Sequence, residues 1–152
     1  MSDAFVSGLT GSIQSTCRRV DCVAFKGSKE AMNIFHQDIE PFQNLKSMPD
    51  NYADLMSATS WEGEEEVNSL GIDISGTLEA LQSDKNLLIR EIYDMAFNAY
   101  LDGEWGKCKV LFHLWLEKFP GDAVVQVLVQ FLIKNNFETP SDWSGHHVLQ
   151  AK

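Results

Sequence analysis

Residues 17–39 read CRRVDCVAFKGSKEAMNIFHQDI and predict an antiparallel β-hairpin. Residues 20–25 alternate between two sets of side chains, a period of two that is typical of a strand. Gly27 and Ser28 form a turn signal, and residues 31–38 then supply a second apolar strand. An isolated two-stranded hairpin is only marginally stable in water, so this one needs a further sheet or a helical surface to pack against.

Three helices are predicted C-terminal to the hairpin, between residues 83 and about 134. Ser83 or Asp84 is a suitable N-cap for the first, which carries two apolar stripes and ends at Gly103. The second follows Gly103 and stops at Pro120-Gly121. The third begins after Asp122 and is apolar on almost every side, so we expect it to be buried on more than one face.

Helix, glycine turn, helix and proline is the plan of a tetratricopeptide repeat. The positions that fit its spacing are Ala96, Gly103, Trp105, Cys108, Phe112 and Pro120. Trp115 departs from the pattern, because the repeat usually has a small residue there. Only one repeat is visible, from about residue 89 to 122, whereas a solenoid needs roughly three. The alternative is a plain three-helix bundle in which the aromatic residues are simply core.

The predicted fold class is therefore α+β and mainly α, in three zones. Residues 1–40 hold the hairpin, preceded by a possible short helix, and residues 83–152 hold the helical module with a tryptophan-containing tail. Residues 41–82 are predicted to be mostly an acidic linker or wrapping segment, with room for a short strand or helix near residues 70–81. No Lys or Arg occurs from residue 47 to 84, whereas nine acidic residues do.

Composition restricts the partners and the compartment. The formal net charge is −10, which argues against nucleic acid or an anionic membrane as the main partner, because both require a cationic surface. The most apolar run, residues 124–133, is too short to span a bilayer, so no direct membrane insertion is expected. The three cysteines form no CxxC pair, which favours a reducing, intracellular compartment and no structural metal site.

The hairpin resembles the last hairpin of a class III nucleotide cyclase domain. The matching positions are Arg19, Asp21, Val23, Lys26, Gly27, Ile34, Phe35 and Asp38. In that family the lysine of the Lys-Gly turn contacts the nucleotide triphosphate, so the resemblance makes Lys26 a candidate for binding phosphate. The alternative for Lys26 is a solvated surface charge, as expected for a lysine at a turn.

The C-terminal part is similar to the helical module that follows this domain in large protist adenylate and guanylate cyclases. The matching positions are Tyr100, Gly103, Trp105, Pro120, Asp122, Pro140, Trp143, Gly145 and Lys152. The resemblance implies an interaction or assembly role. The residues that we expect to carry protein contacts are Tyr100, Trp105, Trp115 and Trp143.

The resemblance also implies what the chain does not do. Cyclases of this class use two metal-binding Asp residues, an Asn and an Arg, and no segment here matches them. His146 and His147 are interpreted as incidental rather than as metal ligands. We therefore expect no catalytic residues, no metal ligands and no turnover by this chain alone. Mg²⁺ and ATP or GTP would be required only by a complete parent cyclase.

Three functions follow as hypotheses. The first is a non-catalytic C-terminal portion, or truncated paralogue, of such a cyclase, serving as an interaction module in cyclic-nucleotide signalling on the cytoplasmic side of a membrane. The second is a structural subunit of a larger assembly, a ciliary one included, with cyclase-derived docking elements. The third is a split cyclase completed in trans by the rest of a cyclase domain. In all three the partners are other protein chains.

Overall fold

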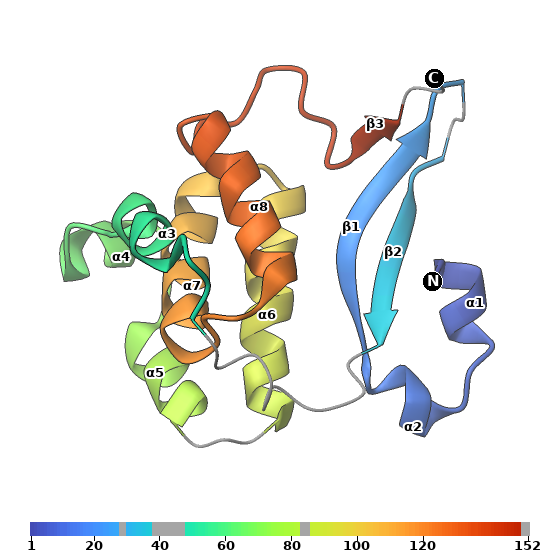
Figure 1. Ribbon diagram of the computed structural model, residues 1–152, viewed down its shortest axis with the longest axis horizontal. Coiled ribbons are helices and arrows are strands. Elements are labelled where there is room, and N and C mark those ends of the chain that lie inside the picture. Colours follow the sequence, from blue (N-terminus) through green and yellow to red (C-terminus); the bar gives the residue numbers. More distant parts are fainter. Residues whose placement is uncertain (28–29, 38–47, 83–85, 150–152) are drawn as a thin grey trace.

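The structure, a computed structural model, describes residues 1–27, 30–37, 48–82 and 86–149. It confirms an α+β fold that is mainly helical, with a small sheet on one side of a helical bundle (Figure 1). The elements in chain order are α1 Asp3–Ser7, α2 Gly11–Gln14, β1 Cys17–Phe25, β2 Met32–Gln37, α3 Tyr52–Thr59, α4 Glu64–Ser69, α5 Ile74–Gln82, α6 Asn86–Leu101, α7 Trp105–Lys118, α8 Ala123–Lys134 and β3 His147–Leu149.

The sheet has the strand order β2-β1-β3 and contains the predicted hairpin. β1 pairs with β2 in antiparallel register, and β3 runs parallel to β1 beside Val23–Phe25. The start of the chain lies along the other edge of β2, where the Met1 ammonium donates to the Phe35 carbonyl at 2.8 Å. A third strand was not predicted, and it places the chain's last described residues against its first strand.

α6, α7 and α8 form the helical layer that carries most of the core. Gly103, at the turn between α6 and α7, has a φ of +77°, a conformation that favours glycine. A Cβ at this position would lie 2.9 Å from a methyl carbon of Thr139, so a larger residue would also require the Thr139 side chain to move. Cys108 and Phe112 of α7 are fully buried, and the tetratricopeptide-like assignment stays a prediction.

Residues 52–82 form three short helices rather than a linker, and this corrects the sequence interpretation for the described part of zone 41–82. α3 packs on α7 and α8, and α5 packs on α6 and α7. Leu55, Val67, Ile72 and Leu81 are buried in the same core as the long helices. Each short helix therefore contributes one or two apolar anchors, while most of its acidic side chains face solvent. Residues 41–47 lie outside the described part.

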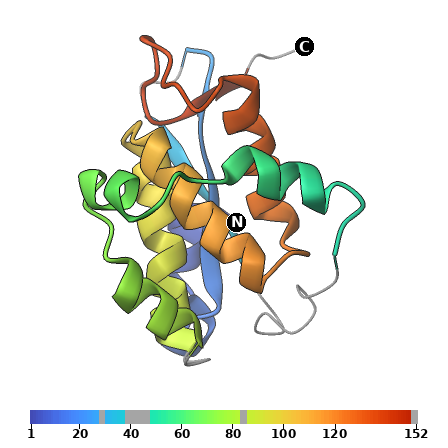
Figure 2. The same cartoon turned by 90° about the vertical axis from the view of Figure 1, so that its left-hand side faces the viewer.

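The hairpin and the short acidic helices lie on opposite sides of the long helices, as Figures 1 and 2 show. α6 lies nearest the sheet, where β1 packs on it. α1 and α2 form in the region where one short helix was expected, and the first ends at Gly8. This arrangement leaves α8 facing β1 across a space at the sheet side of the molecule.

Candidate functional site

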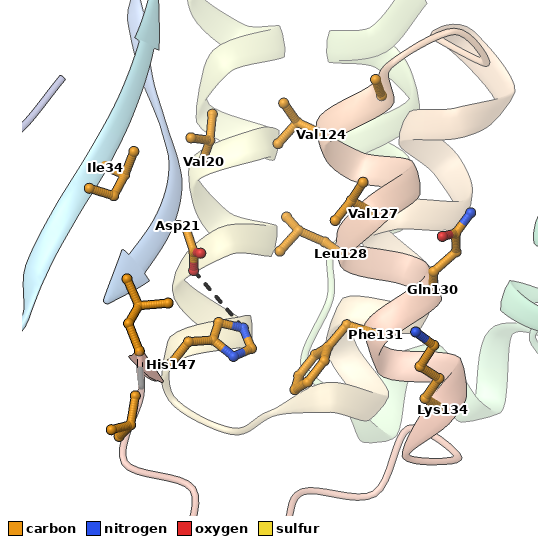
Figure 3. A pocket seen from close by; sticks show the side chains of 13 residues that line it. Val20, Asp21, Ile34, Val124, Val127, Leu128, Gln130, Phe131, Lys134 and His147 are labelled. Carbon is orange, nitrogen blue, oxygen red and sulfur yellow. Dashed lines mark ion pairs between the residues drawn. The ribbon is translucent and has the colours of Figure 1, made fainter. Parts of the chain in front are cut away.

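The candidate site is a groove between the sheet and α8, which we call the sheet–α8 groove (Figure 3). Its volume of about 800 Å³ lies within the range of roughly 300–1,000 Å³ typical of binding pockets. β1 and β2 form one wall, α8 forms the opposite wall and β3 forms one end. The lining residues are Val20, Asp21, Ile34, Ala123, Val124, Val127, Leu128, Gln130, Phe131, Lys134, His147, Val148 and Leu149.

The α8 wall is apolar because α8 carries apolar side chains on two faces. Asp122 caps this helix by accepting hydrogen bonds from the backbone N–H groups of Val124 and Val125, at 3.1 and 3.3 Å. Val129 is fully buried in the core, whereas Val127 on the other face is 64% exposed. The prediction that this helix is buried on more than one face is confirmed, because α8 packs on both α7 and α3. Val127 lies on a further face that no described element covers.

A bulge in β1 shapes the sheet wall. The register passes from the pair Arg19–Phe35 to the pair Asp21–Ile34, which leaves Val20 without a partner in β2. Neighbouring side chains of a regular strand point to opposite faces of the sheet. Because the bulge interrupts this alternation, Val20 and Asp21 both line the groove (Figure 3).

Polar groups converge at the β3 end of the groove. The Tyr100 hydroxyl lies 2.5 Å from Nε2 of His147, and a carboxylate oxygen of Asp21 lies 4.0 Å from the same nitrogen. Burial raises the pKa of Tyr100 far above its usual range, and the charge of Asp21 adds to this effect. Tyr100 therefore keeps its proton, and its hydroxyl shares a hydrogen bond with Nε2 of His147. Asp21 also accepts a hydrogen bond from the backbone N–H of Cys22 at 2.8 Å.

Aromatic rings hold this end in place. The His147 ring packs edge-on against Phe131 and Trp143, with centroids 4.6 and 5.5 Å apart. Trp143 packs in turn on Trp105 at 5.2 Å, and its indole N–H donates to the Leu101 carbonyl at 3.1 Å. Trp143 thus fixes the segment that follows α8 to the helices, and this segment places His147 at the end of the groove.

A buried ion pair fixes the opposite end, next to Val20 and α8. The Arg18 guanidinium donates two hydrogen bonds to the Asp122 carboxylate, at 2.6 and 3.0 Å. The indole N–H of Trp115 donates to the same carboxylate at 2.9 Å. Arg18 also lies over the Tyr93 ring, 4.7 Å from its centroid. Trp115 therefore makes a contact from α7 to Asp122 that a small residue at this position could not make.

The predicted contact residues lie mostly in the core. Tyr100, Trp105 and Trp115 are at most 1% exposed, so none of them reaches a partner while the fold is intact. Trp143 is half-buried and packs beside the groove without lining it. Three of the four residues thus support the groove from within.

Lys26 follows the last residue of β1 and is exposed. Its backbone N–H donates to the Leu149 carbonyl at 3.1 Å, and it is not among the lining residues of the groove. A contact of Lys26 with phosphate stays a prediction.

Sequence reasoning missed the residues that distinguish the groove, namely Asp21, Val127, Lys134 and His147. One signal was available, because an apolar residue on the outer face of the third helix predicts a further packing partner. The role of His147 had no such signal, since it depends on the fold of the tail. The histidine that was interpreted as incidental therefore forms the end of the groove.

Within the described ranges, no group of three His, Cys, Asp or Glu residues is placed to hold a metal ion. None of the helices in these ranges is long and apolar enough to cross a membrane. No family model matches the chain, and no curated protein or solved structure shows significant similarity to it.

Proposed function

We propose that this chain is a non-catalytic interaction and assembly module in cyclic-nucleotide signalling, as the C-terminal portion or a truncated paralogue of a class III nucleotide cyclase. The cyclase-like residue patterns of the hairpin and the tail support the origin. Exposed apolar side chains of the sheet–α8 groove support the interaction role, and this observation carries the proposal. Mg²⁺ and ATP or GTP belong to a complete parent cyclase, and the location is the cytoplasmic side of a membrane.

The groove has the composition of a protein-binding surface. Val127, Val148 and Leu149 are 64%, 58% and 42% exposed, and all three line it. Contiguous exposed apolar surface rimmed by polar groups is typical of sites for protein–protein contact. A partner that covers these side chains removes apolar surface from water at roughly 25 cal/mol per Å². The partners are therefore other protein chains or the rest of a cyclase domain.

The contacts of β1 favour the second candidate, a structural subunit of a larger assembly such as a ciliary one. β1 is already paired with β2, and with β3 over Val23–Phe25, so that end of the strand has no open edge for another sheet. The Arg18–Asp122 ion pair also ties the hairpin to this chain's own helices. Both features support docking through the finished module rather than through completion of a cyclase sheet at β1.

Co-purification with a groove variant tests the interaction role. The tagged chain is expressed in its native cells, and the proteins bound to wild type, Val127→Asp and Leu78→Asp are quantified by mass spectrometry. Leu78 is a matched control because it is an exposed apolar residue of α5, 37% exposed and outside the groove. We expect Val127→Asp alone to lose specific partners.

The identity of the lost partners separates the two candidates. Loss of a protein with cyclase motifs supports the signalling module, and loss of axonemal subunits supports the structural one. An unchanged set of bound proteins for Val127→Asp would remove the groove as the interaction site.

A further inference from the structure

We propose that the groove binds an amphipathic helix of a partner protein, and that this helix carries an acidic residue facing Lys134. The inference rests on the interaction role proposed above and specifies the chemistry of the partner. It depends on three features of the groove: the spacing of the apolar residues on α8, the state of the β1 edge and the position of Lys134.

The α8 wall has the periodicity of a helix-packing surface. Val124, Val127, Leu128 and Phe131 line the groove at i, i+3, i+4 and i+7, a stripe about 10 Å long. Side chains at this spacing form ridges and grooves into which a second helix packs. The sheet supplies apolar Val20 on the facing wall (Figure 3). A helix lying between the two walls would bury both, in the helix-in-groove mode of recognition.

An added strand fits the groove less well. A strand continuing β3 along β1 would need the backbone groups of β1 that precede Val23. The Arg19 carbonyl already accepts a hydrogen bond from the Tyr93 hydroxyl at 2.6 Å. The Cys22 N–H already donates to the Asp21 carboxylate at 2.8 Å. Because these edge groups are engaged by side chains, the partner gains more from apolar contacts than from backbone pairing.

Lys134 gives the groove a local positive charge in an acidic chain. It is the last residue of α8, it is exposed, and its side chain lies beside Phe131 (Figure 3). Among the described residues, no carboxylate pairs with it. On the opposite wall, Asp21 repels a second carboxylate. We therefore expect an acidic residue on the bound helix to be favoured only on the side that faces α8. This preference also sets how the helix is oriented in the groove.

Synthetic peptides that differ by one charge test this inference. The host is a helix of about 18 residues with leucines at i, i+3, i+4 and i+7 and uncharged polar residues elsewhere. One position flanking the leucines is Glu, Gln or Lys. Binding of each labelled peptide to the full chain is measured by fluorescence anisotropy, for wild type, Lys134→Glu, Val127→Asp and Lys107→Glu. Lys107 is the charge-matched control, because it lies on α7 outside the groove.

Wild type is expected to bind the Glu peptide about two- to fivefold tighter than the Lys peptide, the usual strength of an exposed ion pair. The net charge of −10 favours binding of the Lys peptide. Tighter binding of the Glu peptide therefore requires a local cation in the groove. Lys134→Glu should reverse the order, and Lys107→Glu should preserve it. Val127→Asp should weaken all three peptides.

Two failures are distinguishable. If the three peptides bind wild type equally, or if Lys134→Glu keeps the same order of peptide affinities, an acidic partner helix is excluded. The proposed interaction role still stands in that case, provided that Val127→Asp weakens peptide binding. If no peptide binds, or if Val127→Asp changes nothing, the amphipathic helix is excluded and the groove loses its support as an interaction site.

Discussion

Arg18 and Asp122 lie 104 residues apart in the chain and form a buried, bidentate ion pair. Their side chains are 3% and 1% exposed. The same Asp122 carboxylate caps α8 and accepts the indole N–H of Trp115. One residue therefore joins the first strand, α7 and α8. The hairpin, which would be marginal alone, is stabilised because it is held by this pair.

Removing either partner of this pair should destabilise the protein strongly. Arg18→Ala leaves the Asp122 charge buried, and Asp122→Asn leaves the guanidinium buried. The expected loss is about 3–5 kcal/mol in the free energy of unfolding, because an uncompensated buried charge is costly. Urea denaturation followed by tryptophan fluorescence measures it.

Arg19 provides the control, since it is the neighbouring arginine on β1. It donates to Asn98 at 2.7 Å and lies 3.8 Å from Asp94, but its side chain is 24% exposed. Arg19→Ala should therefore cost less than about 1 kcal/mol. Equal losses for Arg18→Ala and Arg19→Ala would contradict the structural role given to the Arg18–Asp122 pair.

The hairpin and the long helices could be predicted because their signals are local. Alternation over residues 20–25 and the glycine after it indicated β1, which in the structure begins three residues earlier, at Cys17. β3 could not be predicted, because three residues carry no usable period. Its pairing depends on the tail that Trp143 fixes to the bundle.

The helices of residues 52–82 were missed for a related reason. Acidic residues without cations are typical of solvated linkers. Among the side chains whose burial is described, each helix buries one or two, such as Leu55 in α3 and Val67 in α4, and these form no long apolar stripe. Packing of α3 and α5 against α7, and of Val67 into the same core, supplies the stability that local propensity does not.

The groove itself was beyond sequence reasoning. It depends on the bulge at Val20, on the distance between β1 and α8, and on a histidine brought from the tail. None of these has a periodic signature. The aromatic residues were predicted to contact partners, and their burial was not predictable, since Tyr100 and Trp105 fit a buried core as well as a contact surface.

Tyr100→Phe tests the hydrogen bond at the end of the groove. The variant keeps the buried ring and removes only the hydroxyl that shares a hydrogen bond with Nε2 of His147. We expect a loss of about 1 kcal/mol in the free energy of unfolding. We also expect the nitrogen chemical shifts of the His147 imidazole to change, because Nε2 loses its hydrogen-bond partner.

The control for this variant is Tyr52→Phe, because Tyr52 lies half-buried on α3, away from the groove. Its effect should be within about 0.5 kcal/mol. Unchanged imidazole nitrogen shifts of His147 in Tyr100→Phe would mean that the hydroxyl makes no hydrogen bond to that ring.

Cys108 should report global unfolding. It is fully buried in α7, and burial raises the pKa of its thiol, with the nearby Glu104 carboxylate adding to the effect. Since the thiolate is the reactive form, alkylation should be negligible in the native state and should follow the urea transition. Pulsed alkylation with mass spectrometry of the labelled peptides measures this, and Cys22, which is half-buried, serves as the internal comparison. Native-state labelling of Cys108 at the rate of Cys22 would contradict the packing of α6 on α7.

His113 should make the protein less stable in mild acid. Burial lowers the pKa of His113 in the folded state below the value of about 6.5 that it has when unfolded. Below pH 6.5 the unfolded chain therefore binds more protons than the folded one, and the free energy of unfolding falls as the pH decreases. Urea midpoints measured between about pH 7.5 and 5.5 should show this slope, which spans the ordinary pKa of histidine.

The His113→Gln variant should flatten this slope, because it removes the group that the fold keeps neutral. Nδ1 of His113 lies 3.0 Å from the Thr59 hydroxyl, whose own proton is donated to the Leu55 carbonyl. The Gln amide can donate to that hydroxyl, so the variant keeps a donor beside α3 without the titration. If His113→Gln shows the same loss of stability in acid as wild type, this loss arises from titratable groups other than His113. The contact between α3 and α7 would then not depend on a neutral imidazole.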